Sequence, residues 1–147
     1  CSCGRKGCLE TYVSATGMIR TVTSLIAEFN SYKGSLLDLP MSHLNAKMIT
    51  ELALSGDEIA KRALILTGEI LGKALANMVA LFNPQHIYLA GGVTHADQLL
   101  LVPTRQSFYQ HLLNVYPDQI TIEKSKFDDH EGAILGASVL IWQLNEA

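Results

Sequence analysis

The spacing of apolar residues predicts a chain made mostly of helices. Apolar positions recur at helical intervals over residues 9–29 and again over residues 57–82. In the second segment they are Ile59, Ala63, Leu66, Ile70, Ala74, Met78 and Leu81. Ser55 followed by Glu58 is a capping-box pattern, which predicts that the longest helix opens there. A shorter helix is expected over about residues 45–54.

Two short runs rich in β-branched and aromatic residues predict strands. The first, residues 86–90, follows Asn83-Pro84, which should end the long helix, and closes at Gly91-Gly92. The second covers residues 120–123. Two further helices are expected, from a cap of Thr94 with Asp97 to Leu113 and from a cap of Asp128 with Glu131 to about Leu144. Strands that alternate with helices indicate an α/β fold.

Composition excludes several classes of function. The 147 residues are 48% hydrophobic and 17% charged, as in one globular domain. The net charge of −3 and the scattered lysines and arginines argue against nucleic-acid binding through this region. The longest uncharged stretch, residues 74–96, contains asparagines and a proline, so no membrane span is expected. Nothing resembles a signal peptide, and we expect a cytoplasmic protein.

All three cysteines, Cys1, Cys3 and Cys8, lie within the first eight residues. The glycines between them allow the backbone to fold tightly around one ion, and thiolates are preferred zinc ligands. The fourth ligand must come from elsewhere. The alternatives are three free thiols, or one disulfide with a spare thiol, and reducing compartments disfavour disulfides. We expect a structural zinc site, because a fully ligated zinc has no open position for chemistry.

The string CSCGRKGCLE resembles the C-x-C-G-x-x-G-C-L/I-E signature of the ROK family of bacterial sugar kinases and repressors. Asn83-Pro84 with the following strand and Gly91-Gly92, and the segment 131–137, resemble later parts of the same family. The resemblance implies an actin-like, hexokinase-type ATPase fold. The expected fold class is therefore α/β, a mixed sheet flanked by helices.

The chain begins with Cys1, inside this signature, rather than with methionine. We therefore expect residues 1–147 to be the C-terminal lobe of a longer protein. Residues 1–10 would form the zinc-binding knuckle and residues 11–147 the α/β body. In the family, the fourth zinc ligand is a histidine a few residues upstream of the first cysteine.

The resemblance also implies roles for single residues. Glu10 matches a glutamate that hydrogen-bonds sugar hydroxyls, although the residue type alone also suits an acid that stabilises a helix N-terminus. Gly91 and Gly92 match a turn that approaches the nucleotide. Ala90 stands where the family's kinases commonly have the first of three glycines. No catalytic residue is expected in this lobe, because the family's catalytic aspartate and phosphate motif lie in the N-terminal half.

One further segment, Ser14–Gly17 with Arg20, resembles the glucokinase branch of the family, but equally suits a helical turn with small residues packed on a neighbour. The resulting prediction is an ATP-dependent, glucokinase-like sugar kinase. It would act on a hexose with ATP and Mg²⁺ and would form a homodimer. A sugar-responsive transcriptional repressor of the same family is the main alternative, and a sugar-binding or assembly module without catalysis is a third.

Overall fold

The computed structural model describes residues 1–29, 31–40, 43–116, 120–127, 131–132, 134–135 and 137–139. Within them lie four α-helices, three short 3₁₀ helices and two strands. In chain order these are η1 (Leu9–Thr11), α1 (Ala15–Glu28), η2 (Ser35–Asp38), α2 (Ala46–Ser55), α3 (Glu58–Phe82), β1 (His86–Leu89), η3 (Gly92–Ala96), α4 (Gln98–His111) and β2 (Thr121–Lys124). The predicted strands and the helices from residue 45 to residue 113 are confirmed to within a few residues.

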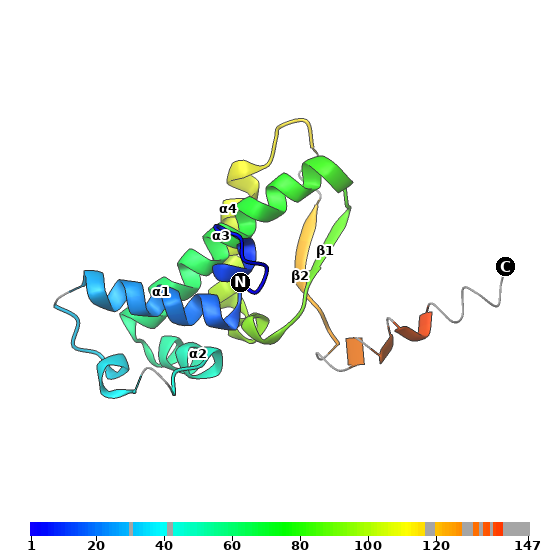
Figure 1. The fold of residues 1–147 in the computed structure, drawn as a ribbon. Helices are drawn as coiled ribbons and strands as arrows, with labels where there is room; N and C mark the ends of the chain where they lie inside the picture. The colour runs from blue at the N-terminus through cyan, green and yellow to red at the C-terminus, as the bar shows by residue number, and fades with distance from the viewer. Residues whose placement is uncertain are drawn as a thin grey trace.

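The 25-residue helix α3 is the centre of the structure. It packs against α1, α2 and α4, and Figure 1 shows α1 and α2 grouped at one end of it with the strands beside the other. Two hydrophobic clusters result. The first joins α1, α2 and the start of α3 around Met18, Ile49 and Leu64. The second joins the end of α3 to α4 and the strands around Val79 and Phe108.

Helices α3 and α4 approach each other closely because α3 has two glycines where they meet. A Cβ on Gly68 would lie 2.8 Å from Pro103 Cγ and 2.9 Å from the Leu100 carbonyl oxygen. A Cβ on Gly72 would collide with the Thr104 carbonyl oxygen and lie 2.7 Å from the Phe108 backbone nitrogen. The four-residue spacing of these glycines predicts close helix packing, and the structure confirms it.

Helix α3 is also long and apolar enough to cross a membrane by length and composition, and it is the one such helix in the described part of the chain. Ten of its residues are buried inside the structure. Packing against the neighbouring helices therefore accounts for its apolar face, as is usual for the core helix of a globular domain.

The two strands are parallel, with His86 paired to Thr121 and Leu89 to Lys124. The connection between them runs through α4, as parallel pairing requires. Tyr109 of α4 donates a hydrogen bond of 2.7 Å to the carbonyl oxygen of Ile120, which holds β2 against the helix. The expected mixed sheet is seen only as this parallel pair within the described residues, so the part that the structure supports is a helix-rich α/β lobe.

Tyr32 ties the loop after α1 to the start of α3. Its hydroxyl donates to the Asp57 carboxylate and accepts from the Leu36 backbone N–H at 3.2 Å. Partial burial, together with the hydrogen bond to Asp57, raises the pKa of Tyr32 to about 12. The other oxygen of Asp57 accepts from the backbone N–H of Ala60 at 2.9 Å. One carboxylate thus fixes the loop and caps the longest helix.

That geometry corrects the predicted cap at Ser55 and Glu58. Ser55 is the last residue of α2, which ends because Gly56 adopts a left-handed conformation with φ +108°. The cap of α3 is Asp57 instead. Glycine favours helix ends and a carboxylate is as good an N-cap as a serine hydroxyl, so Gly56 ends α2 and Asp57 opens α3 two residues after the predicted cap.

The predicted continuous helix over residues 9–29 is also wrong, because it is divided into η1 and α1. Ser14 caps α1, and its hydroxyl accepts from the Gly17 backbone N–H at 3.0 Å. Gly17 in turn lies so close to Tyr12 that a Cβ there would be 2.7 Å from the Tyr12 carbonyl carbon. A side-chain cap inside an apolar pattern therefore starts a new helix.

The predicted cap of Thr94 with Asp97 is wrong as well. Thr94 lies inside the short helix η3, where its hydroxyl donates to the Gly91 carbonyl oxygen at 2.7 Å, and α4 begins only at Gln98. Asp97 precedes α4 with φ +46° and makes no side-chain capping bond. The predicted last cap includes Asp128, and Asp128, Gly136 and Leu144 lie outside the described residues.

Candidate functional site: the cysteine knuckle and the glycine turn

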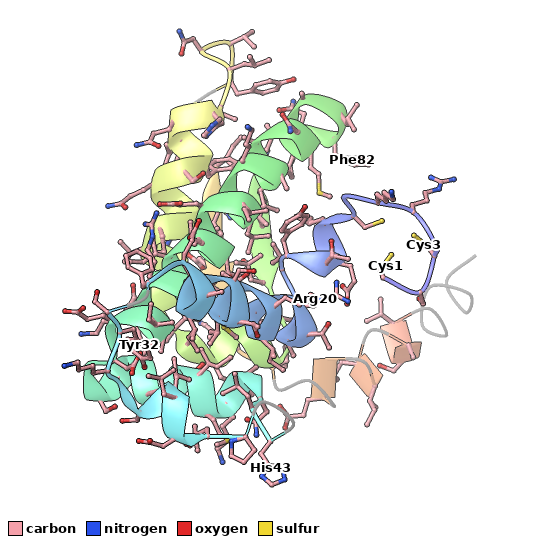
Figure 2. The ribbon with its side chains drawn as sticks, turned by 60° about the vertical axis from the view of Figure 1, so that its left-hand side comes forward. Cys1, Cys3, Arg20, Tyr32, His43 and Phe82 are labelled. Atoms are coloured by element: carbon pink, nitrogen blue, oxygen red, sulfur yellow. The ribbon has the colours of Figure 1, made fainter. Side chains whose placement is uncertain are left out.

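The three cysteine sulfurs lie together at the N-terminal loop. Cys1 Sγ is 2.9 Å from Cys3 Sγ, and Cys3 Sγ is 3.4 Å from Cys8 Sγ. All three sulfurs lie within 4.8 Å of one another, and none is in a disulfide. Figure 2 shows Cys1 and Cys3 close together on the loop beside the helices. The sequence prediction that these residues share one site is therefore matched by their positions.

Two glycines and a 3₁₀ helix produce this arrangement. Gly4 and Gly7 both adopt φ +73°, a left-handed conformation that turns the chain back on itself between the cysteines. Helix η1 begins directly after Cys8, and it packs against α1 and α3. The backbone N–H of Arg5 lowers the pKa of the Cys3 thiol, and the hydrogen bond from Cys8 lowers it further. Hydrogen bonds to the sulfur favour the thiolate, which is the form that binds metal.

The donor set fits a zinc ion. Thiolates about 2.3 Å from a tetrahedral zinc are about 3.8 Å apart, and these sulfurs, all within 4.8 Å of one another, are near enough to share one ion. Cys1 and Cys3 are exposed and Cys8 is half-buried, so the cluster is accessible to an ion and to a fourth ligand. The three-cysteine cluster is thus a candidate metal site in which Cys1, Cys3 and Cys8 would supply three of the four ligands.

Glu10 lies in η1, two residues after the last cysteine, and its side chain is exposed. The sequence indicated that Glu10 would lie at the start of a long α-helix. It lies instead in a 3₁₀ helix of three residues. A helix this short has little dipole for an acid to stabilise, which weakens the purely structural explanation for Glu10. The backbone of Glu10 is thus held two residues from Cys8 by η1.

The second candidate site is the turn at Gly91 and Gly92. It follows β1 directly, and Gly91 has φ +102°. A Cβ at either glycine would have no neighbour within 4 Å, so the backbone is open to an incoming group. The turn leads into η3, five residues long, and not into the capped α-helix that the sequence predicts.

A small hollow of about 200 Å³ adjoins this turn at the carboxyl ends of the two strands. Ligands of α/β proteins commonly bind at this edge of a parallel sheet. The lining residues are Ala90, Gly91, Thr94, His95, Lys124, Ser125, Lys126 and Phe127. Lys124 and Lys126 were not predicted from the sequence, and the feature that could have revealed them is their place at and just after the end of the strand that pairs in parallel with β1.

The short helices that adjoin the two candidate sites pack against different α-helices. The knuckle helix η1 packs on α1 and α3, whereas η3 after the glycine turn packs on α2 and α4. A family model, that of the ROK family, matches residues 1–143, which include both sites.

The chain belongs to the ROK family. Two curated ROK relatives have different activities in their names. The N-acetylglucosamine repressor of Escherichia coli is 32% identical over 141 residues, which cover 96% of this chain and 33% of the repressor. The glucokinase of Halalkalibacterium halodurans is 33% identical over 148 aligned positions, which cover 99% of this chain and 44% of the enzyme.

A solved ROK structure agrees with the fold. The ROK family glucokinase of Streptomyces griseus, in complex with glucose and AMPPNP, superposes with a TM-score of 0.79 at 27% identity. The match covers 90% of this chain and 44% of that protein. The chain therefore spans between a third and a half of the length of the ROK proteins that it resembles, and the repressor and the kinase are about equally similar to it.

A second hollow, of about 550 Å³, separates the knuckle of this ROK chain from α1. Arg5, Lys6 and Arg20 contribute to its wall, together with Thr11 and Thr21. Glu10 is not among the residues that line it, and of the segment resembling glucokinases, Ser14–Gly17 with Arg20, only Arg20 is. Ser14 and Gly17 instead make the helix cap, so their positions support the structural explanation for those two residues.

Proposed function

We propose that this chain is the C-terminal lobe of an ATP-dependent sugar kinase of the ROK family, similar to the glucokinases. The observation that carries the proposal is the open glycine turn at the carboxyl ends of β1 and β2. Gly91 and Gly92 leave the backbone accessible, as close contact with a nucleotide requires. The glucokinase of similar fold was solved with a nucleotide analogue and glucose, which supports both substrates.

In this proposal Glu10 binds the sugar. A carboxylate accepts hydrogen bonds from two neighbouring hydroxyls at once, which suits a hexose. The knuckle would act as its rigid support, with Cys1, Cys3 and Cys8 bound to zinc and a histidine upstream as the fourth ligand. Zinc would supply structure and no chemistry there, because four protein ligands leave no open position.

The remaining parts of the reaction are assigned to the N-terminal lobe. Phosphoryl transfer depends mainly on positioning and on neutralising charge, and it needs a base near the attacking hydroxyl. We place that base, and the main phosphate contacts, outside this chain. None of the described residues that line the 200 Å³ hollow beside the glycine turn carries a carboxylate, the ligand that Mg²⁺ prefers. Mg²⁺ would therefore be held by the nucleotide and the other lobe. The whole protein would be a cytoplasmic dimer.

A second function, a sugar-responsive transcriptional repressor, is favoured by one specific observation. The N-acetylglucosamine repressor is as similar to this chain as the glucokinase is. In that case Glu10 would bind an effector sugar rather than a substrate, and a DNA-binding domain would precede the chain. Ala90, in place of a first turn glycine, is compatible with weaker nucleotide contact.

One experiment separates the two functions. The full-length protein is assayed for sugar-dependent ADP release with glucose, mannose and N-acetylglucosamine, and the Gly91→Val variant is assayed in parallel. The kinase predicts turnover with one of these sugars and loss of turnover in the variant, with a matched Gly132→Ala variant unaffected. Absence of turnover with every sugar, combined with sugar-dependent release of DNA carrying the protein's own promoter, would establish the repressor instead.

A further inference from the structure

The hollow between the knuckle and α1 gathers three cationic side chains from two separate parts of the chain. Arg5 and Lys6 come from the loop between the cysteines, and Arg20 comes from the first half of α1. Figure 2 shows Arg20 on α1 beside the cysteine loop. All three residues are exposed. Positive groups that converge on one hollow attract an anion, and arginine in particular pairs with the oxygens of a phosphate.

The backbone that carries these cations is fixed at two independent places. Arg5 and Lys6 lie between Gly4 and Gly7, which both adopt φ +73° and so hold the pair at the outside of a tight loop. Arg20 lies in the second turn of a 14-residue α-helix. The charges therefore reach the hollow from ordered backbone on both of its sides.

The wall that α1 contributes changes in character along the helix. After Arg20 come the hydroxyls of Thr21 and Ser24, and the wall ends with the carboxylate of Glu28. Glu28 is the one acid among the described residues that line the hollow. It follows Arg20 by eight residues, which is about 12 Å along the helix axis. The positive and negative ends of this wall are therefore well separated, with hydroxyls between them.

The threonine hydroxyls in the hollow have already donated their protons within the protein. Thr21 donates to the Gly17 carbonyl oxygen at 3.1 Å, and Thr11 donates to the Cys8 carbonyl oxygen. Their oxygens, like the carboxylate of Glu28, remain as acceptors. A sugar hydroxyl can donate to such groups, whereas a phosphate oxygen pairs with the cations. The lining thus suits one ligand that carries an anionic group at one end and hydroxyls at the other.

The volume of the hollow, about 550 Å³, matches such a ligand. Sites that take a whole small molecule have volumes of about 300–1,000 Å³. We propose that this hollow binds a phosphorylated sugar, with the phosphate at Arg5, Lys6 and Arg20 and the sugar hydroxyls at Thr21 and Glu28.

The proposed site is separate from those of the proposed function. Glu10, assigned there to the sugar, does not line this hollow, and neither do the glycines assigned to the nucleotide. The inference therefore goes beyond the proposed function and does not depend on the choice between a kinase and a repressor.

The test measures binding to the full-length protein by calorimetry. The probes are the 6-phosphates of glucose, mannose and N-acetylglucosamine, the three parent sugars, and inorganic phosphate. For the 6-phosphate that binds, we expect Arg20→Gln and Lys6→Gln each to raise the dissociation constant about tenfold, because a charge-assisted hydrogen bond is lost. Binding of the parent sugar should be unchanged, and inorganic phosphate should bind more weakly because it has no sugar hydroxyls. Lys61→Gln, an exposed lysine outside the hollow, is the matched control.

A Glu10→Gln variant distinguishes this hollow from the proposed sugar site. Binding of the 6-phosphate that falls in Glu10→Gln and not in Arg20→Gln would assign the ester to the sugar site and overturn the inference. Failure of the wild type to bind any of the three 6-phosphates more tightly than inorganic phosphate would overturn it as well.

Zinc content, measured on every variant, separates ligand binding from support of the knuckle. Loss of zinc and of ligand in Lys6→Gln, with Arg20→Gln like the wild type, would reduce the basic pair to a structural role and overturn the inference. None of these outcomes bears on the proposed function, which is tested by ADP release.

Discussion

Arg105 of α4 makes two hydrogen bonds to one backbone atom of β2. Its Nε and Nη2 atoms donate to the carbonyl oxygen of Ile122 at 2.9 Å and 2.7 Å. Ile122 is buried and belongs to the second hydrophobic cluster. A half-buried guanidinium therefore joins a helix to the middle of a four-residue strand. The same strand carries Lys124 to the hollow beside the glycine turn.

Replacing Arg105 with glutamine should destabilise the full-length protein. Hydrogen bonds from a charged donor contribute about 1.5–3 kcal/mol, and the variant leaves the Ile122 carbonyl without its charged partner. We expect a loss of about 2 kcal/mol in the free energy of unfolding, measured by urea denaturation. Gln106→Ala, at an exposed neighbouring position, is the control. Equal free energies of unfolding for the two variants would mean that the hydrogen bonds from Arg105 to Ile122 do not stabilise the protein.

Gly72→Ala should be among the most destabilising single changes in the chain. The added methyl would collide with the backbone of Thr104 and Phe108, and a backbone atom of α4 cannot move aside as a flexible side chain can. Overpacking costs about 1–3 kcal/mol and occasionally more, and here we expect the upper end. Thermal unfolding measures the effect, with Asn77→Ala on the exposed face of α3 as the control. A melting temperature like that of the control would contradict the close packing.

The full-length protein should contain about one zinc ion per chain, because the three thiols of Cys1, Cys3 and Cys8 lie as close as ligands of one ion. Elemental analysis after purification without chelator measures the content. Cys8→Ser should abolish it, and Ser2→Ala should leave it unchanged. Zinc-free protein, or a disulfide among these cysteines under reducing conditions, would overturn the assignment.

Glu10→Gln in the full-length enzyme should impair the use of sugar and not of ATP. The amide keeps the shape of the side chain but loses the charge, and charge-assisted hydrogen bonds are worth about 1.5–3 kcal/mol. We expect kcat/KM for the sugar to fall about tenfold or more, with KM for ATP little changed. Glu58→Gln, which also removes an acid from a first helical turn, is the matched control. Loss of stability with unchanged kinetics would reduce Glu10 to a structural residue.

The 147-residue chain by itself should have no kinase activity. Its described residues offer no base beside the sugar site, and a positioned general base contributes about 10²–10⁴-fold to rate. We expect ADP release with glucose to be at background for the chain and sugar-dependent for the full-length protein. A rate within tenfold of the full-length enzyme would show that the active site lies within this chain.

The sequence predicted the parts of the fold that depend on local chemistry. The long apolar period of α3, its end at Asn83-Pro84 and the glycines at 68 and 72 each have a local cause, and each was found as expected. Cap positions were missed where two residues compete for one role. Asp57 displaced Ser55, and Thr94 bonded backward to Gly91 rather than forward into α4.

In the candidate sites too, only residues that are neighbours in the sequence could be assigned to one site in advance. The cysteines could be assigned together because they are adjacent in the chain. Lys124 and Lys126 could not be linked to Gly91 from the sequence, because they meet through the parallel pairing of β1 with β2, more than thirty residues apart. The crossing through α4 that brings them together depends on tertiary packing, which leaves no local pattern.

The two glycines of α3 have a consequence for the order in which the chain folds. Each lowers the stability of an isolated helix by about 1 kcal/mol relative to alanine, so the middle of α3 is weak before it meets a partner. Backbone contact with α4 at Gly68 and Gly72 is what compensates for that weakness. The complete α3 should therefore form only as α4 docks, and the two helices should enter the folding nucleus as a pair.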